Sequence, residues 1–302
     1  MKSNSIKVRI VGGLGNQLFG LVFGLAISEK INAKLILDGS FVSLGSNATR
    51  KLAVSDFDLG QFSVSYTGKI IQYIPFLRSN SLIRKITGKI LRFFKRSILE
   101  EDLLDSFKFR AGQTFTGYFH NWSYADYLFQ KHSDFMLNLK SKSRTLLIME
   151  KNLQLNDPIC VHVRLGDFLV HSNLYSTLPE KYYLEAITQI QKTYANREVW
   201  IFTESESELK NYYPQLAKIS NLIIDQKTSI SDTEAFYLLS NSKFLVTSNS
   251  TFSLWAAWFV EKSNNYVIVP SFNSHSDLNG GLLDKRWNSV NTDTFQFTQG
   301  EN

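Results

Sequence analysis

The stretch Ile6-Lys7-Val8-Arg9-Ile10-Val11-Gly12-Gly13-Leu14-Gly15-Asn16-Gln17 joins a short apolar segment to a glycine-rich turn. Residues 6–11 are typical of a buried β-strand, and residues 12–15 of a tight turn. Residues 35–38 predict the next strand, and between the two strands apolar side chains recur at helical spacing, at Leu18, Phe19, Val22, Phe23, Ala26 and Ile27. The sequence therefore predicts a βαβ unit whose glycine loop lets backbone N–H groups approach an anion.

This glycine loop lacks the complete dinucleotide fingerprint. From Gly13 and Gly15, the third glycine of G-x-G-x-x-G would fall at position 18, which is a leucine. A glycine-rich first turn can also serve only close packing in a doubly wound fold. We therefore disfavour a nicotinamide-binding protein.

A second informative stretch is Val161-His162-Val163-Arg164-Leu165-Gly166-Asp167. Residues two apart on a strand share a face, so His162 and Arg164 are expected to project side by side before the strand breaks at Gly166. An arginine fork at the carboxyl end of a strand suits phosphate oxygens. The alternative is a core strand whose exit turn carries an Arg–Asp ion pair.

The third stretch begins after a predicted strand at residues 244–247. Five of the six residues in Ser248-Asn249-Ser250-Thr251-Phe252-Ser253 carry hydroxyl or amide side chains, where a helix should start. One of them can cap the helix, and the others can form an anion site with the free N–H groups. An ordinary N-cap explains one such residue but not five.

Together these stretches resemble glycosyltransferase family 11, the α-1,2-fucosyltransferases, and more distantly the α-1,6- and protein O-fucosyltransferases. The family pattern G-G-L-G-N-Q-L-F is reproduced at residues 12–19, H-x-R-R-G-D-Y appears at residues 162–168, and N-S-[ST]-F-S-W-W-A-A-W appears at residues 249–258. A weaker similarity to the family is found at Thr116-Gly117-Tyr118-Phe119. Four positions depart from the patterns: Leu165 replaces a second Arg, Phe168 replaces a Tyr, Leu254 replaces a Trp, and Glu204 is displaced from the carboxylates of F-S-D-D.

The resemblance implies a GT-B fold, an α/β architecture of two Rossmann-like domains whose parallel sheets face a central cleft. Residues 1–150 would form the acceptor-side domain with the glycine loop, and residues 151–302 the GDP-sugar-binding domain. The carboxyl half alternates accordingly, with predicted strands near residues 159–163, 198–202, 222–224, 243–247 and 266–269.

The resemblance also implies roles for individual residues. Arg164 would grip the β-phosphate and the glycosidic oxygen, His162 would lie near the guanosine, and Asn16 would face them across the cleft. Ser250, Thr251 and Ser253 are expected to hold phosphate. The remaining expected site residues are Asn249, Phe252 and Glu204 for the donor, Asp167 to orient Arg164 or cap its turn, and Gly12, Gly13, Gly15 and Gln17 in the glycine loop.

The reaction implied is inverting transfer of L-fucose from GDP-β-L-fucose to the 2-hydroxyl of a galactoside in a surface glycan of the O-antigen type. Asp38 and Glu204 are the candidates for the group that takes the acceptor proton, and the donor phosphate is a third. Two alternatives stay open: another GDP-sugar such as GDP-L-colitose, or a non-catalytic nucleotide- or glycan-binding module.

No resident cofactor or metal is expected, because the chain has no His/Cys cluster with zinc spacing. Asp56-Phe57-Asp58 spells the D-x-D manganese signature of another glycosyltransferase fold. In this resemblance, however, residues 52–62 match a structural strand with apolar Leu52, Val54, Phe57 and Leu59. Arg164 and the hydroxyl cluster would neutralise the diphosphate instead.

Composition is compatible with an enzyme of two domains. The 302 residues are 43% hydrophobic, and the single Cys160 excludes an internal disulfide, as in a reducing compartment. No apolar run is long enough to cross a membrane, and a strand expected from Ile6 leaves no room for a signal peptide. We expect a bacterial cytoplasmic protein that does not bind nucleic acid.

One basic segment is not explained by these motifs. Residues 69–96 contain eight basic and no acidic side chains, in a chain whose net charge is +6. A helix at 82–98 would place its apolar residues in one sector and its cations in the other, which suits an anionic membrane surface and a lipid-linked acceptor. The alternative is a helix whose apolar face belongs to the core of the first domain.

Overall fold

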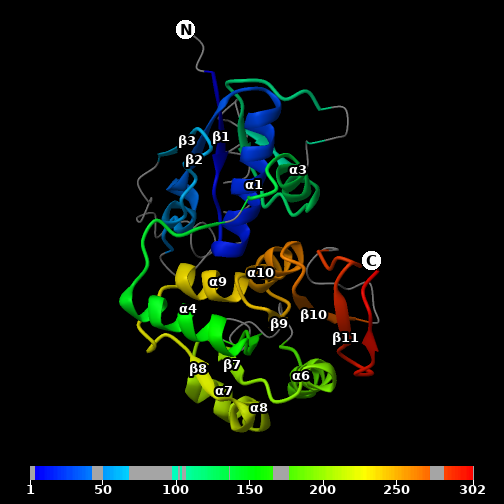
Figure 1. The fold of residues 1–302 in the computed structure, drawn as a ribbon. Helices are drawn as coiled ribbons and strands as arrows, with labels where there is room; N and C mark the ends of the chain where they lie inside the picture. The colour runs from blue at the N-terminus through cyan, green and yellow to red at the C-terminus, as the bar shows by residue number, and fades with distance from the viewer. Residues whose placement is uncertain are drawn as a thin grey trace, which may run out of the picture. The chain divides into compact units, whose positions relative to one another are not determined.

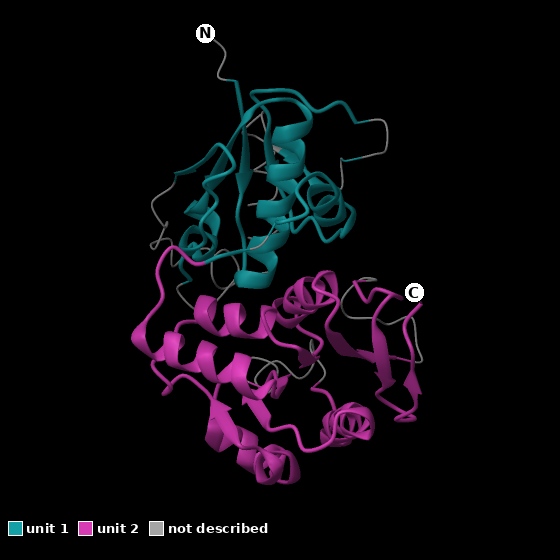
Figure 2. Ribbon diagram, in the orientation of Figure 1, with its two compact units in different colours: residues 1–138 teal, residues 139–302 magenta. Residues whose placement is uncertain are grey.

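The computed structural model describes residues 4–42, 50–67, 97–100, 103, 107–135, 137–165, 177–272 and 282–301. The chain divides into two compact units, unit 1 (residues 1–138) and unit 2 (residues 139–302) (Figure 2). The division lies before helix α4 (Arg144–Asn156), whereas the sequence suggested a boundary after residue 150. The start of α4 belongs to unit 2 because Lys142 and Glu150 are hydrogen-bonded to Tyr237 of α9 (Asp232–Ser240).

Unit 1 is built on a five-stranded parallel sheet in the order β3-β2-β1-β5-β4 (Figure 1). Its strands are β1 (Ser5–Arg9), β2 (Lys34–Asp38), β3 (Val64–Thr67), β4 (Ser97–Leu99) and β5 (Thr114–Thr116). Its helices are α1 (Leu14–Lys30), α3 (Ser123–Lys131) and two short 3-10 helices, η1 (Gly39–Phe41) and η2 (Ala53–Asp56). The predicted order of strand, glycine loop, helix and strand is confirmed.

Helix α1 is the core of unit 1, and all six apolar positions predicted from its spacing are buried. Its remaining side packs on α3, so the helix is apolar nearly all round. Gly24 permits close packing on the sheet, because a Cβ atom there would lie 2.6 Å from Leu35 Cδ1.

Two predictions in unit 1 are wrong in whole or in part. Residues 52–62 were expected to form a strand, but residues 53–56 form η2. The predicted apolar residues Val54 and Phe57 are nonetheless fully buried. Most of the predicted basic helix at 82–98 lies outside the described residues, but its last two, Ser97 and Ile98, belong to β4.

Unit 2 contains a seven-stranded sheet in the order β12-β11-β10-β9-β6-β7-β8, parallel except for β12. Its strands are β6 (Ile159–His162), β7 (Val199–Phe202), β8 (Leu222–Ile224), β9 (Phe244–Val246), β10 (Tyr266–Ser271), β11 (Asn288–Asn291) and β12 (Phe297–Thr298). Besides α4 and α9, its helices are α6 (Glu180–Thr193), α7 (Glu206–Tyr212), α8 (Pro214–Ile219) and α10 (Thr251–Lys262). All five strands predicted in the carboxyl half are confirmed.

The two faces of the unit 2 sheet carry different helices. Helices α9 and α10 pack together on one face with α4 beside α9, whereas α6, α7 and α8 cover the other (Figure 1). Cys160 is a free thiol buried in β6. Two units built on parallel sheets confirm the predicted α/β, GT-B class.

None of the helices in the described part of the chain is both long enough and apolar enough to cross a bilayer.

Candidate active site

The sheet of unit 2 reverses its winding direction between β6 and β9. From β6 the chain proceeds outward through β7 to β8, and then returns to β9 on the other side of β6 and continues to β10. In open α/β sheets, ligands bind outside the carboxyl ends of the strands at such a switch point. The strand ends that meet here are followed by the second and third stretches singled out in the sequence.

His162, the last residue of β6, is joined to the end of β9 by a hydrogen bond. Its Nδ1 atom lies 2.9 Å from the Oγ atom of Ser248, and its ring lies 5.1 Å from that of Phe252. The His162 side chain is only 6% exposed. Burial, together with the positive charge of Arg164, lowers the pKa of His162 to about 3, so the ring is neutral at physiological pH.

Hydrogen bonds position the Ser248 hydroxyl against this neutral ring. Ser248 Oγ accepts from the backbone N–H of Ser250 (3.3 Å), and Ser253 Oγ can donate to the carbonyl oxygen of Ser250 (3.2 Å). The Ser248 hydroxyl can donate to His162 Nδ1 or accept from it, and its Oγ also lies 3.2 Å from the Oγ of Ser253. A ring that accepts at Nδ1 carries its own proton on Nε2, which can donate to a ligand oxygen.

Arg164 is held by a carboxylate from the neighbouring strand. Its Nη1 atom lies 2.6 Å from Glu204 Oε1, and Glu204 Oε2 accepts from the backbone N–H of Leu165 (3.1 Å). Glu204 follows β7, which pairs with β6. This geometry gives Glu204 the orienting role that the sequence suggested for Asp167, a residue outside the described part of the chain. Both Glu204 oxygens are engaged, one by Arg164 and the other by the Leu165 N–H, which disfavours Glu204 as the proton acceptor.

The polar run after β9 forms the start of α10. Ser250 is the N-cap, and its Oγ accepts from the backbone N–H of Phe252. Ser253 and Asn249 are buried, whereas Thr251 and Phe252 are partly exposed. The Ser253 hydroxyl lies within hydrogen-bonding distance of backbone carbonyl oxygens, so it closes the turn, and Ser250 and Thr251 are better placed to meet a ligand.

In unit 1, the glycine loop connects β1 to α1. Gly12 has φ +78°, and a Cβ atom there would lie 2.9 Å from Asn16 Nδ2, so the turn and the Asn16 side chain both require glycine. Gly13 is the N-cap residue of α1 and makes no side-chain capping bond, and Gly15 lies inside the helix. Asn16 Oδ1 lies 3.1 Å from His120 Nε2.

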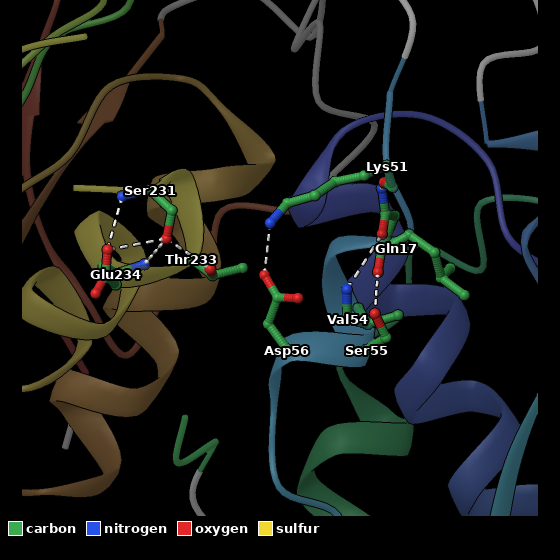
Figure 3. A network of polar contacts seen from close by, with 9 residues as sticks. Gln17, Lys51, Val54, Ser55, Asp56, Ser231, Thr233 and Glu234 are labelled. Atoms are coloured by element: carbon green, nitrogen blue, oxygen red, sulfur yellow. Dashed lines mark hydrogen bonds and ion pairs between the residues drawn. The ribbon is translucent and has the colours of Figure 1, made fainter. Parts of the chain in front are cut away.

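Gln17, expected in the loop site, serves the structure of unit 1. Its Nε2 atom donates to the carbonyl oxygens of Gly12 and Lys51, both at 3.0 Å, and its Oε1 atom accepts from the N–H of Val54 (Figure 3). These bonds satisfy backbone groups that a strand ladder would otherwise satisfy, which explains the 3-10 turn at η2. The Gln17 side chain is therefore a buried tie between the glycine loop and η2.

The carboxylates considered for catalysis or metal binding in unit 1 have local partners. Asp38 is buried and caps η1, since its Oδ1 accepts from the N–H of Ser40 (3.1 Å). Asp56 is paired with Lys51 at 2.7 Å (Figure 3). Asp58 Oδ1 accepts from the N–H of Gly60. Within the residues described by the structure, no three His, Cys, Asp or Glu side chains gather as a metal site would require.

Two residues in loops that follow strand ends, Ser248 and His120, were not chosen from the sequence. Ser248 stood within the polar run, but only its contact with His162, 86 positions away, shows its importance. His120 follows Thr116-Gly117-Tyr118-Phe119, a weak echo of the family, and its partner Asn16 lies 104 positions away. Contacts of such separation cannot be read from local spacing.

Comparison with known proteins agrees with these motifs. Residues 78–291 match the family model described as Glycosyl transferase family 11. The O-antigen biosynthesis glycosyltransferase WbnK of Escherichia coli is 25% identical over 286 residues, covering 86% of this chain and 91% of that protein. An α-1,2-colitosyltransferase of Escherichia coli is 24% identical over 284 residues, covering 88% of this chain and 91% of that protein.

Among solved structures, the fucosyltransferase NodZ from Bradyrhizobium aligns with 86% of this chain and 94% of its own, at 15% identity and a TM-score of 0.49. The family assignment itself depends on the family model, whose match extends over more than half of the chain. On that basis, the chain belongs to glycosyltransferase family 11.

Proposed function

We propose that this glycosyltransferase transfers L-fucose from GDP-β-L-fucose to the 2-hydroxyl of a β-galactoside in an O-antigen type glycan. The acceptor oxygen forms a bond to the anomeric carbon as the bond to the β-phosphate oxygen breaks. GDP leaves with that electron pair, the acceptor hydroxyl loses its proton, and the anomeric configuration inverts. The α-1,2 linkage is supported by the related colitosyltransferase.

The main support for this proposal is the arrangement at the switch point of unit 2. A neutral histidine, an arginine held by a carboxylate and the N-terminus of α10 lie together there. In this proposal the Arg164 guanidinium neutralises the charge that develops on the leaving diphosphate. The Nε2–H of His162 donates to an oxygen of the nucleotide. Ser250, Thr251 and the N–H groups of α10 bind phosphate oxygens.

The donor has one specific alternative, GDP-L-colitose, which lacks the 3-hydroxyl of fucose. This alternative is supported by the similarity of most of this chain to an α-1,2-colitosyltransferase. The two donors differ only at the sugar, so the contacts assigned to the diphosphate would serve either.

The direct test incubates the wild-type protein with GDP-fucose or GDP-colitose, with and without a β-galactoside, and measures GDP release and glycoside formation. We expect fucosylated product and slow hydrolysis without acceptor. Arg164→Ala should abolish most of both activities. Arg197→Ala is the matched control, because Arg197 is also a partly buried arginine of unit 2 and lies 3.6 Å from a carboxylate, that of Asp157.

Each other outcome has a definite meaning. Activity with GDP-colitose alone would show that the donor is GDP-colitose and not GDP-fucose. The protein would still be a glycosyltransferase. Binding of GDP without hydrolysis or transfer of either sugar would favour a non-catalytic module.

The proposed acceptor is lipid-linked, and the basic segment at 69–96 suits contact with an anionic membrane. Co-sedimentation with anionic vesicles should fall with salt and with neutralisation of Lys85, Lys89, Arg92 and Lys95. Salt-insensitive binding, or no binding, would leave the protein without membrane contact through this segment.

A further inference from the structure

Unit 1 has a switch point of its own, between β1 and β5. The two strands are parallel neighbours, with β2 and β3 beyond β1 and β4 beyond β5. Their carboxyl ends are followed by the glycine loop and by residues 117–122, which form a second pair of converging loops. By the same topological rule, a ligand is expected here as well.

His120 connects the two loops. Because Asn16 Oδ1 can only accept, the Nε2 atom of His120 donates to it across 3.1 Å. Partial burial lowers the pKa of His120, although the negative charge of Glu100 opposes this, so the ring is neutral at physiological pH. Its Nδ1 atom is then a hydrogen-bond acceptor, suited to a ligand hydroxyl.

The loop after β5 is held in a shape that turns Tyr118 outward. The carboxylate of Glu100 accepts from the backbone N–H groups of Tyr118 (2.8 Å) and His120 (3.2 Å). Between them, Phe119 adopts φ +53° and stacks on Phe23, with ring centroids 3.9 Å apart and an interplanar angle of 5°. Phe119 is therefore buried while Tyr118 is 48% exposed.

The exposed Tyr118 ring stacks on the ring of His120, with centroids 5.3 Å apart and an interplanar angle of 26°. An aromatic surface beside an imidazole and a carboxamide suits a neutral sugar, whose C–H face packs on the ring while its hydroxyls bond to nitrogen and oxygen. An anionic ligand is disfavoured, because Glu100 is close enough to influence the titration of His120.

We propose that Tyr118 and His120, with Asn16, form the acceptor-sugar subsite of unit 1, with the Tyr118 ring as its platform. This inference rests on the proposed transfer to a β-galactoside. It assigns to unit 1 a carbohydrate site whose side chains are separate from those of the donor site.

Two measurements test the subsite. The first is the acceptor KM for lactose with GDP-fucose as donor. Tyr118→Ala should raise this KM roughly three- to ten-fold by removing the platform, and Tyr118→Phe should recover most of the loss. Tyr212→Ala is the matched control, because Tyr212 is a similarly exposed tyrosine (50%) on α7 of unit 2. His120→Gln, which keeps a donor and an acceptor, should retain more kcat/KM for lactose than His120→Ala.

The second measurement needs no turnover. Saturation-transfer NMR with methyl β-D-galactopyranoside should give a signal for the wild type and Tyr212→Ala that is lost in Tyr118→Ala. An unchanged KM and an unchanged NMR signal in Tyr118→Ala would overturn the subsite, as would a wild type that gives no signal. Failure of GDP binding would instead refute the proposed function, and the galactoside signal would still decide the subsite.

Discussion

The guanidinium of Arg164 lies 2.6 Å from the Glu204 carboxylate, so its position is set by the fold before any ligand binds. If it stabilises the leaving diphosphate, Arg164→Ala should lower kcat by about a hundred- to a thousand-fold, ~3–4 kcal/mol. Arg164→Lys should recover little, because one ammonium cannot reproduce the bidentate fork. Near-normal turnover of a folded Arg164→Lys protein would contradict the assignment.

His162 provides a second test at the scale of one side chain. Because its pKa is lowered to about 3, ¹⁵N spectra of the imidazole should show a neutral ring throughout pH 5–8. The unfolded chain binds this proton near pH 6.5, so the free energy of unfolding should fall as the pH drops below about 6.5. His162→Asn should weaken that dependence. A His162 titration midpoint between pH 6 and 7 would show that the ring is not buried as described.

At the scale of elements, the Gln17 side chain holds η2 against the glycine loop. Gln17→Leu would leave the carbonyl oxygens of Gly12 and Lys51 and the N–H of Val54 without this partner. We expect a loss of about 2–4 kcal/mol in unfolding free energy, measured in urea. Gln130→Leu, on the exposed surface of α3, is the control and should be nearly neutral. If the Gln17→Leu protein has normal stability but lacks activity, Gln17 has a functional role in the site and not a structural one.

The same elements show what could be predicted from the sequence and what could not. The apolar spacing of α1 and the buried runs of the parallel strands are local patterns, and both were predicted correctly. The turn at η2 was mistaken for a strand because its backbone groups bond to Gln17, more than thirty positions earlier. The compact units divide before α4, where Lys142 and Glu150 contact Tyr237, almost a hundred positions later.

In the candidate site, too, some residues could be predicted from local sequence and others depend on contacts distant in sequence. His162, Arg164 and Ser250 stood in motifs adjoining strand ends, and the structure brings them to one switch point. Ser248 as the partner of His162, and Glu204 as the partner of Arg164, depend on contacts between different strands. Long-range pairing, rather than spacing along the chain, decides such roles.

At the scale of the whole molecule, transfer should not require a divalent metal ion. The charge of the diphosphate is assigned to Arg164 and the N-terminus of α10, and Asp56 and Asp58 are engaged with Lys51 and Gly60. Product formation should therefore persist in excess EDTA, with added magnesium or manganese giving at most a modest increase. Complete loss with the chelator, restored by manganese, would contradict this and identify a metal-dependent reaction.

In the proposed reaction, the switch point of unit 2 binds the diphosphate of a GDP-sugar. Titration of the ¹⁵N-labelled protein with GDP tests it most directly, because backbone amides and imidazole nitrogens report the site without turnover. We predict saturable shifts concentrated at His162, Arg164 and residues 250–252, with little change along α4, and weak binding in Arg164→Ala. Shifts confined to other parts of the chain, or wild-type affinity in Arg164→Ala, would contradict the account.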